Sequence, residues 1–224
     1  MIECKELCYA YHTEPVLNHV SFSVPEGAAV LLEGDNGAGK STLLKIVNGL
    51  LFPQQGEYFF CGQQITADKM REHKFSKWYH QKIGFIWQNP EVQLFCNHVE
   101  EEIAFGPRQM ELSEEEVQRR TDDAIRLLSL EHLRFRAPYH LSGGEKKKTA
   151  IASVLVMNPE VWTLDEPFAS LDKKSQQWLV QFLLELKKAG KTILLSTHEA
   201  SVCEELLDFR IVLDPSYGAR VDKV

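Results

Sequence analysis

A glycine-rich segment at residues 34–42 constrains the fold of this chain more than any other part of the sequence. It reads Gly-Asp-Asn-Gly-Ala-Gly-Lys-Ser-Thr, follows the apolar run 28–32 and precedes a helical pattern. Glycines in such a loop let backbone N–H groups turn inward around phosphate oxygens, Lys40 adds a positive charge, and the Ser41 hydroxyl can bind Mg²⁺. The segment predicts a strand, a phosphate-binding loop and a helix start, with a nucleoside triphosphate as ligand.

The composition is that of an ordinary globular protein. The chain has 224 residues, of which 44% are hydrophobic, so it can bury a substantial core. Its net charge of -7 gives no basic field for nucleic acid, and we expect no nucleic-acid partner. No apolar run approaches the roughly 20 residues of a membrane span, and no signal peptide is evident at the N-terminus. Five scattered cysteines favour a reducing compartment and packing roles.

Strand and helix patterns alternate along most of the chain. Apolar and aromatic runs predict strands at 2–11, 16–24, 57–60, 83–87, 161–164, 192–195 and 209–213. Helical patterns cover about 39–49, 113–128, 144–157, 173–188 and 199–207. This alternation predicts a mostly parallel sheet covered by helices. The polar and basic stretch 66–82 is expected to be a solvated connector rather than a nucleic-acid patch.

One of the predicted helices has a clear start and a clear buried face. Ser113 and the three glutamates after it form a capping box. Four apolar residues are expected to form the stripe that faces the core. They are Val117, Ala124, Leu127 and Leu128.

Three further segments place polar residues where a nucleotide-binding sheet needs them. Ser142-Gly143-Gly144-Glu145 precedes a helix, Asp165-Glu166 ends the strand 161–164, and Ser196-Thr197-His198 follows the strand 192–195. Taken alone, a Ser-Gly-Gly turn is a common helix start, and two adjacent acids could cap a helix. Because ligands of parallel sheets bind at the carboxyl ends of strands, their order with the phosphate loop favours one shared site.

Together these segments resemble the motifs of ATPase subunits of ATP-binding-cassette (ABC) transporters, over nearly the whole chain. Residues 34–42 look like Walker A, Gln88 looks like the Q-loop glutamine, and 141–145 look like the signature. Asp165 and Glu166 look like Walker B and the acid that follows it.

Three shorter matches complete the resemblance. Ser170-Leu171-Asp172 resembles the D-loop, and His198 resembles the switch histidine. Tyr11 is similar to the aromatic residue that stacks on adenine, although Tyr9 lies on the same expected strand face.

The resemblance implies ATP and Mg²⁺ as cofactors, with roles for individual residues. Glu166 would orient or deprotonate the attacking water and His198 would contact the γ-phosphate, assisted by Lys40 and Gln88. The implied Mg²⁺ ligands are Ser41, Gln88 and Asp165. The implied nucleotide-binding residues are Tyr11, Gly34, Asp35, Asn36, Gly37, Ala38, Gly39, Lys40, Ser41, Thr42, Ser142, Gly143, Gly144, Glu145 and Asp172.

The implied fold is α/β, of the P-loop NTPase type. Its RecA-like, mostly parallel sheet would be joined by an antiparallel β subdomain and an inserted α-helical signature subdomain. We expect a single ATPase domain over 1–224, with 1–87 and 158–224 forming the nucleotide-binding core and 88–157 the helical subdomain.

The resemblance also implies a head-to-tail dimer, in which the signature of one subunit closes on the nucleotide of the other. The second subunit could be identical or a sibling. Two residues depart from the usual pattern: Glu145 replaces a glutamine and Asp35 stands where a small residue is common. Both carboxylates are expected to face outward, because they would otherwise weaken nucleotide binding.

The stretches 87–95 and 99–107 look like those of energy-coupling-factor importers and of cobalt or nickel importers. In that family a groove receives a helix of a transmembrane subunit, and Val92, Leu94 and Phe95 are expected either to line it or to pack inside the helical subdomain. This implies that the transporter imports a vitamin or a transition-metal ion. The ATPase would lie at the cytoplasmic face of the cell membrane, bound to the transporter complex. A soluble nucleotide switch, an exporter ATPase and an inactive ATP-binding module are the alternatives.

Overall fold

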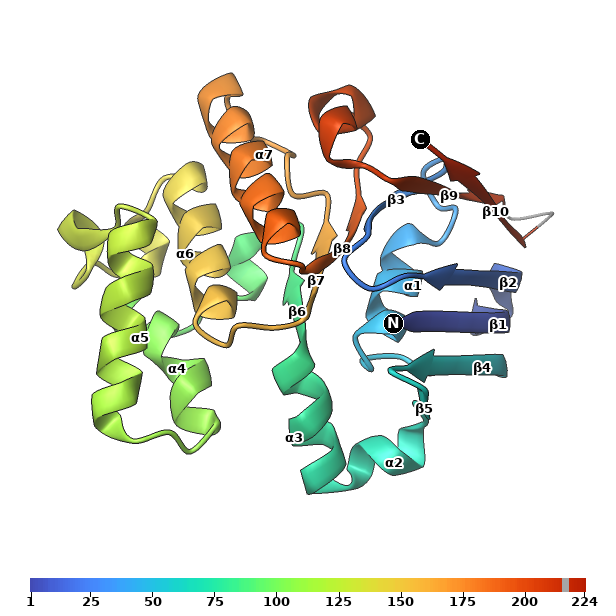
Figure 1. The fold of residues 1–224 in the computed structure, drawn as a ribbon, viewed down its shortest axis with the longest axis horizontal. Coiled ribbons are helices and arrows are strands. Elements are labelled where there is room, and N and C mark those ends of the chain that lie inside the picture. Colours follow the sequence, from blue (N-terminus) through green and yellow to red (C-terminus); the bar gives the residue numbers. More distant parts are fainter. Residues whose placement is uncertain (215–217) are drawn as a thin grey trace.

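The computed structural model describes residues 1–214 and 218–224, and its centre is a six-stranded sheet (Figure 1). Five strands run parallel and β10 is antiparallel at one edge, in the order β10-β9-β3-β8-β7-β6. The strands are β3 (Ala29–Glu33), β6 (Ile83–Ile86), β7 (Val161–Asp165), β8 (Thr192–Ser196), β9 (Phe209–Asp214) and β10 (Gly218–Lys223). The predicted mostly parallel sheet is confirmed.

A second sheet of four antiparallel strands lies beside the first, in the order β2-β1-β4-β5. Its strands are β1 (Ile2–Tyr11), β2 (Glu14–Val24), β4 (Gln55–Phe60) and β5 (Gln63–Gln64). β2 begins two residues earlier than expected and includes Pro15. A proline is tolerated there because β2 is an edge strand and Pro15 needs no partner for a ladder N–H.

The described part of the chain contains seven α-helices. They are α1 (Lys40–Val47), α2 (Ala67–Arg71), α3 (His73–Lys82), α4 (Val99–Gln109), α5 (Glu114–Leu127), α6 (Gly143–Leu155) and α7 (Lys173–Lys188). Of these, α4 and α5 pack on each other and on α6 rather than on a sheet. The helix predicted over 199–207 is wrong, because this segment forms two short 3₁₀ turns, Ala200–Val202 and Glu204–Leu206. So short a segment gains little from helix propagation, and burial of Cys203 and Leu206 fixes the turns instead.

The stretch 66–82 is not the solvated connector that its polar composition predicts. It forms α2 and α3, and Tyr79 on α3 is fully buried. The Tyr79 hydroxyl hydrogen-bonds the Val47 carbonyl at the end of α1, which the Tyr58 hydroxyl also contacts at 3.1 Å. The helix that carries the phosphate-binding loop is therefore anchored at its far end by two buried tyrosines.

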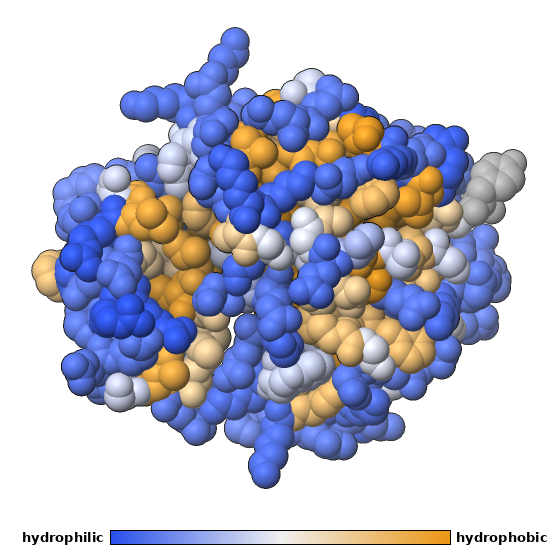
Figure 2. Space-filling view, in the orientation of Figure 1, coloured by the Kyte–Doolittle hydropathy of each residue, from blue (hydrophilic) through white to orange (hydrophobic). Residues whose placement is uncertain are grey.

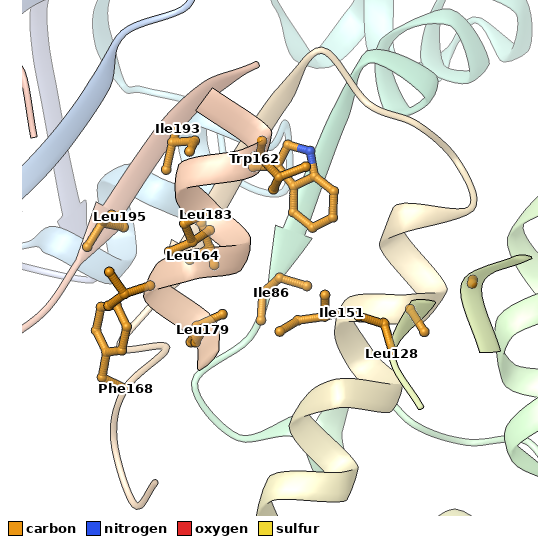
Figure 3. Packing of buried hydrophobic residues seen from close by; sticks show 14 of the residues in the cluster. Ile86, Leu128, Ile151, Trp162, Leu164, Phe168, Leu179, Leu183, Ile193 and Leu195 are labelled. Atoms are coloured by element: carbon orange, nitrogen blue, oxygen red, sulfur yellow. The ribbon is translucent and has the colours of Figure 1, made fainter. Parts of the chain in front are cut away.

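Both faces of the parallel sheet are buried, as the alternation of its side chains shows. Trp162 and Leu164 of β7 face the cluster packed under α6 and α7, which Figure 3 shows with Leu179 and Leu183 of α7. Val161, which directly precedes Trp162 in β7 and points to the other face, joins the opposite cluster with α1 and the antiparallel sheet. Burial on both faces explains why these strands are almost continuously apolar.

The stripe predicted on α5 is confirmed at three of its four positions. Val117, Ala124 and Leu128 are buried, but Leu127 is 65% exposed. At 100° per residue, Leu127 lies about 60° outside the stripe that the buried residues form.

The outer surface is largely polar. Figure 2 shows hydrophilic side chains over most of one face, with the apolar ones in separate patches. Within residues 1–214 and 218–224, no helix combines the length and apolar character that a bilayer span requires.

Candidate active site

The carboxyl ends of four neighbouring strands meet at a cavity of about 580 Å³. The phosphate-binding loop follows β3, Gln88 follows β6, Glu166 follows β7 and His198 follows β8. A cavity of this size is in the range that holds a small-molecule ligand. Its lining consists of Tyr11, Val16, Asn36, Gly37, Gly39, Lys40, Ser41, Thr42, Gln88, Glu166, Ala169, His198 and Glu199.

Local geometry explains why the loop requires a glycine immediately before α1. Gly39 has φ +94°, and a Cβ on it would lie 2.6 Å from Leu17 Cδ2 and 2.9 Å from the Val16 carbonyl oxygen. Only glycine accepts both the left-handed backbone and this close approach. Gly39 is the N-cap of α1, and no described side chain caps the helix there, so its first N–H groups face the cavity.

Lys40 is the first residue of α1 and is largely buried at the cavity wall. Its ammonium donates to the carbonyl oxygens of Gly34 at 2.6 Å and Asp35 at 3.1 Å. The side chain therefore folds back over the loop, where its charge faces the space in front of the helix N-terminus. Anionic phosphates are stabilised at such a position.

A hydrogen-bond network joins the ends of β7 and β8. The Ser196 hydroxyl donates to Asp165 Oδ1 at 2.7 Å and accepts from the Glu166 amide at 3.1 Å. The Glu166 backbone has φ +44°, a conformation rarely adopted by a residue with a side chain. This turn aims the Glu166 side chain into the cavity, while Asp165 stays buried behind it.

The Glu166 carboxylate has one occupied and one free oxygen. Oε2 accepts the backbone N–H of His198 at 3.2 Å. Oε1 is buried and lies 3.3 Å from His198 Nε2, yet it accepts no hydrogen bond from any residue that the structure describes. A buried carboxylate oxygen without a donor is suited to receive one from a water molecule.

Tyr11 lines the cavity, and Tyr9 does not. Tyr11 is 40% exposed, its hydroxyl lies 3.5 Å from Thr42 Oγ1, and its ring packs edge-on against Tyr9 with centroids 5.0 Å apart. Tyr9 packs partly against the core. Of the two tyrosines, Tyr11 is thus the one whose ring is available to a ligand.

The residues expected from the signature lie apart from this cavity. Ser142 caps α6, and Ser142-Gly143-Gly144-Glu145 are absent from the lining given above. Asp172 also lies outside it, and its carboxylate accepts the Ser175 N–H at 2.7 Å as the cap of α7. Within one chain, neither segment reaches the phosphate-binding loop.

The two unusual carboxylates behave differently. Asp35 is exposed and lies outside the cavity lining, as expected. Gly34 and Ala38, which were also expected to bind nucleotide, do not line the cavity either. Glu145 also lies outside the cavity of its own chain, and its Oε2 accepts from both the amide and the hydroxyl of Ser142 at 2.8 Å. These bonds hold the pKa of Glu145 below its usual value. A helix start attracts a carboxylate at its third position.

Several residues of the site were not anticipated from sequence. Val16, Ala169 and Glu199 line the cavity, and Ser196 connects Asp165 to Glu166. Ser196 belongs to the same Ser-Thr-His segment as His198. Its pairing with Asp165 depends on the parallel register of β7 and β8, which cannot be read from the sequence.

The donor set fits Mg²⁺ bound together with a nucleotide. Ser41 and Gln88 line the cavity with a hydroxyl and an amide, and Asp165 lies at the neighbouring strand end. Mg²⁺ prefers oxygen ligands and is commonly held by one carboxylate plus substrate phosphates. No cluster of three or more His, Cys, Asp or Glu that could hold a metal by itself occurs among the described residues.

A separate groove of about 310 Å³ lies on the helical side of the molecule. It is lined by Glu91, Leu94, Phe95, Cys96, Pro138, Tyr139 and Lys146. Of the two expectations for Leu94 and Phe95, this fits the one in which they line a groove. The Phe95 ring also packs edge-on against the Phe105 ring. Val92 is exposed and does not line this groove.

Comparison with known proteins gives this geometry a family. A family model described as ABC transporter matches residues 17–169. The nickel import ATP-binding protein LarO of Lactiplantibacillus plantarum is 40% identical over 99% of this chain and 92% of its own length. The energy-coupling factor transporter ATP-binding protein EcfA of Methanoculleus marisnigri is 41% identical over 96% of this chain and 76% of its own length.

A solved structure agrees with the fold. The dimeric ATP-binding cassette MJ0796, in a post-hydrolysis state bound to ADP and Pi, covers 100% of this chain and 98% of its own, with a TM-score of 0.87 and 28% identity. The family match covers more than half of the chain, and the relatives match nearly all of it. The chain therefore belongs to the ABC transporter family, as one of its ATPase subunits.

Proposed function

We propose that this ATPase energises an importer of the energy-coupling-factor type that carries a vitamin or a transition-metal ion. The observation that carries the proposal is the convergence of Lys40, Gln88, Glu166 and His198 from four strand ends on one cavity. The relatives named for nickel import and for energy-coupling-factor transport support the importer subtype.

Each of these side chains would have a task in ATP hydrolysis. Lys40 and the N–H groups of α1 would hold the β- and γ-phosphates, and Tyr11 would stack on the base. Mg²⁺, bound through Ser41, Gln88 and Asp165, would neutralise phosphate charge.

Glu166 is the residue placed to act on the attacking water. Its free Oε1 would accept a hydrogen bond from that water and orient it. It would take up the water's proton as the water oxygen bonds to the γ-phosphorus and the bond from that phosphorus to the β–γ bridging oxygen breaks. The His198 imidazole, whose Nε2 lies 3.3 Å from Oε1, would link this carboxylate to the γ-phosphate. The products are ADP and inorganic phosphate.

We further propose that the site is completed by a second ATPase subunit. Ser142, Gly143 and Gly144 stand at the exposed or half-buried start of α6, outside the cavity of their own chain. In a head-to-tail dimer these donors, with Asp172 nearby, would reach the nucleotide of the partner. The dimeric assembly of the related cassette MJ0796 supports this arrangement.

The membrane partner would bind at the groove that contains Leu94 and Phe95. Phe95 is 66% exposed, and Tyr139 across the groove is also exposed, which is unusual for large aromatic side chains. A helix of a transmembrane subunit that inserts an apolar side chain here would cover both rings. The chain would then act at the inner face of the cell membrane through its complex.

Substitution of Phe95 tests the membrane partner. Phe95→Asp places a charge in the groove, so we expect loss of co-purification with transmembrane subunits from detergent-extracted membranes, with thermal unfolding unchanged. Leu127→Asp is the matched control, because Leu127 is equally exposed at 65% but lies on α5 outside the groove. A Phe95→Asp protein that still recovers the membrane subunits would refute this assignment.

A further inference from the structure

Lys147 is a buried charged side chain that the reaction described above does not use. It lies on α6, five residues after Ser142, and is only 3% exposed. Burial lowers its pKa to about 8, while the Asp165 carboxylate acts in the opposite direction. A buried ammonium is costly unless it is paired or hydrogen-bonded, so its partners indicate what the charge is for.

Those partners are the backbone carbonyls of two consecutive residues, Trp87 and Gln88. The Lys147 ammonium donates to the Trp87 oxygen at 3.2 Å and to the Gln88 oxygen at 3.0 Å. Two consecutive carbonyls held by one ammonium fix the orientation of the backbone at Gln88. Gln88 itself lines the nucleotide cavity.

A second side chain connects the same segment to the same helix. The Gln93 amide nitrogen donates to the Ala150 carbonyl at 2.9 Å and to Ser153 Oγ at 3.1 Å, both on α6. Its amide oxygen accepts the Trp87 N–H at 3.4 Å. At the surface, Lys146 and Glu91 add an ion pair between α6 and this segment.

Residues 87–93 are thus held on α6 at three successive levels of the helix. The start of that helix is Ser142-Gly143-Gly144, which we propose to meet the partner's nucleotide. The distance along α6 from these residues to Lys147 is about one helical turn. A shift of the helix start would therefore be transmitted through Lys147 to the backbone of Gln88 without an intervening loop.

We propose that Lys147 is a positioning residue of the ATPase reaction, which holds Gln88 in the nucleotide cavity according to the position of the signature helix α6. Gln93 is the second contact of the same connection. This inference rests on the proposed function of Gln88 and of the signature.

Lys147→Met tests the connection, because methionine keeps the length of the side chain but removes its donors. We expect kcat for ATP to fall about 10- to 100-fold, as for other residues that orient a metal ligand. The ATP dissociation constant, measured by calorimetry, is expected to change less than about threefold, because Lys40 and the loop amides are untouched. Amide hydrogen exchange in residues 87–93 is expected to rise.

Three further variants separate positioning from general damage. Lys147→Arg keeps the donors and is expected to recover much of kcat and the slow exchange. Lys148→Met removes the neighbouring charge, which packs 4.8 Å from the Trp178 ring, and is expected to leave both readouts unchanged. Gln93→Met is expected to act as Lys147→Met does, more weakly, and serves if that variant does not fold.

A double mutant gives the sharpest outcome. If Lys147 acts through Gln88, adding Lys147→Met to Gln88→Ala will cost little further kcat, because coupled residues are not additive. The proposal would be overturned if the falls in kcat of the two single variants multiplied fully in the double mutant. It would also be overturned if amide hydrogen exchange in residues 87–93 were unchanged in Lys147→Met. Wild-type protein without any ATP turnover would instead count against the proposed function, and the exchange measurement would still decide the role of Lys147.

Discussion

At the scale of single residues, Ser142 and Glu145 show how one substitution alters the start of a helix. The Ser142 hydroxyl, a donor that the proposed dimer would turn toward the partner's γ-phosphate, is hydrogen-bonded to the Glu145 carboxylate at 2.8 Å. A capping box accepts either glutamate or glutamine at this position. The carboxylate therefore adds a negative charge, rather than a new cap, at the place where phosphate would bind.

Glu145→Gln should consequently favour the ATP-bound dimer. The cap is retained and one negative charge is removed, so the ATP concentration for half-maximal dimerisation is expected to fall about two- to fivefold, the scale of a single charge near a helix end. Analytical ultracentrifugation over an ATP titration measures it. Asp35→Asn is the control, since Asp35 is exposed and outside the cavity, and its ATP dissociation constant should not change. A rise in the ATP requirement of Glu145→Gln would contradict this reading.

Residue types and spacing were enough to predict that Lys40, Glu166 and His198 belong to one site, and the resemblance to ABC transporter ATPases added Gln88. Each follows a strand whose apolar run is visible in the sequence, and parallel strands bring their carboxyl ends together. Ser196 and Lys147 could not be found in this way. Their roles depend on the register of β7 with β8 and on the packing of α6 against the end of β6, which no local pattern determines.

At the scale of elements, the sequence predicted strands better than short helices. The strands of the parallel sheet are buried on both faces, so their apolar runs stand out. The sequence did not predict α3, because its residues are largely polar and Tyr79 is the buried residue among them. The segment 199–207 was overpredicted because tertiary burial, and not local propensity, sets the shape of so short a stretch.

Arg134 connects two helices of the α-helical part. Its guanidinium lies 2.5 Å from Glu100 on α4 and 2.7 Å from Asp122 on α5. The side chains of Arg134 and Glu100 are only about a quarter exposed, at 26% and 25%. The hydrogen bond from Arg134 is the main reason that the pKa of Glu100 lies below its usual value of 4.5.

Arg134→Met should lower the free energy of unfolding by about 1–3 kcal/mol at pH 7, because two partly buried carboxylates lose the cation between them. A carboxylate with a lowered pKa contributes stability above its ordinary pKa and loses it as pH falls through the folded value. The wild type should therefore lose more stability than Arg134→Met as pH falls below about 4.5. Urea denaturation at several pH values measures the difference, and parallel acid curves would rule out this role for the pair.

At the scale of the whole molecule, one edge of one sheet organises the proposed function. The phosphate-binding loop, Gln88, Glu166 and His198 all lie there, whereas the start of α6 stands outside the cavity of its own chain. The helical segment reaches the same edge through Lys147 on α6, whose ammonium donates to the Gln88 carbonyl at 3.0 Å. Nucleotide binding, dimer formation and contact with the membrane subunit would then be coupled through the same helices.

The measurement that tests this account most directly is the behaviour of Glu166→Gln with ATP. The variant keeps the shape of the site but loses the carboxylate, so kcat should fall about 10²–10⁴-fold. ATP should still bind with little change in its dissociation constant and should drive the protein into a stable dimer, seen by analytical ultracentrifugation. Glu160→Gln, at the opposite end of the same strand, should behave like wild type. A Glu166→Gln protein that turns over ATP at the wild-type rate, or remains monomeric when saturated with ATP, would contradict the account.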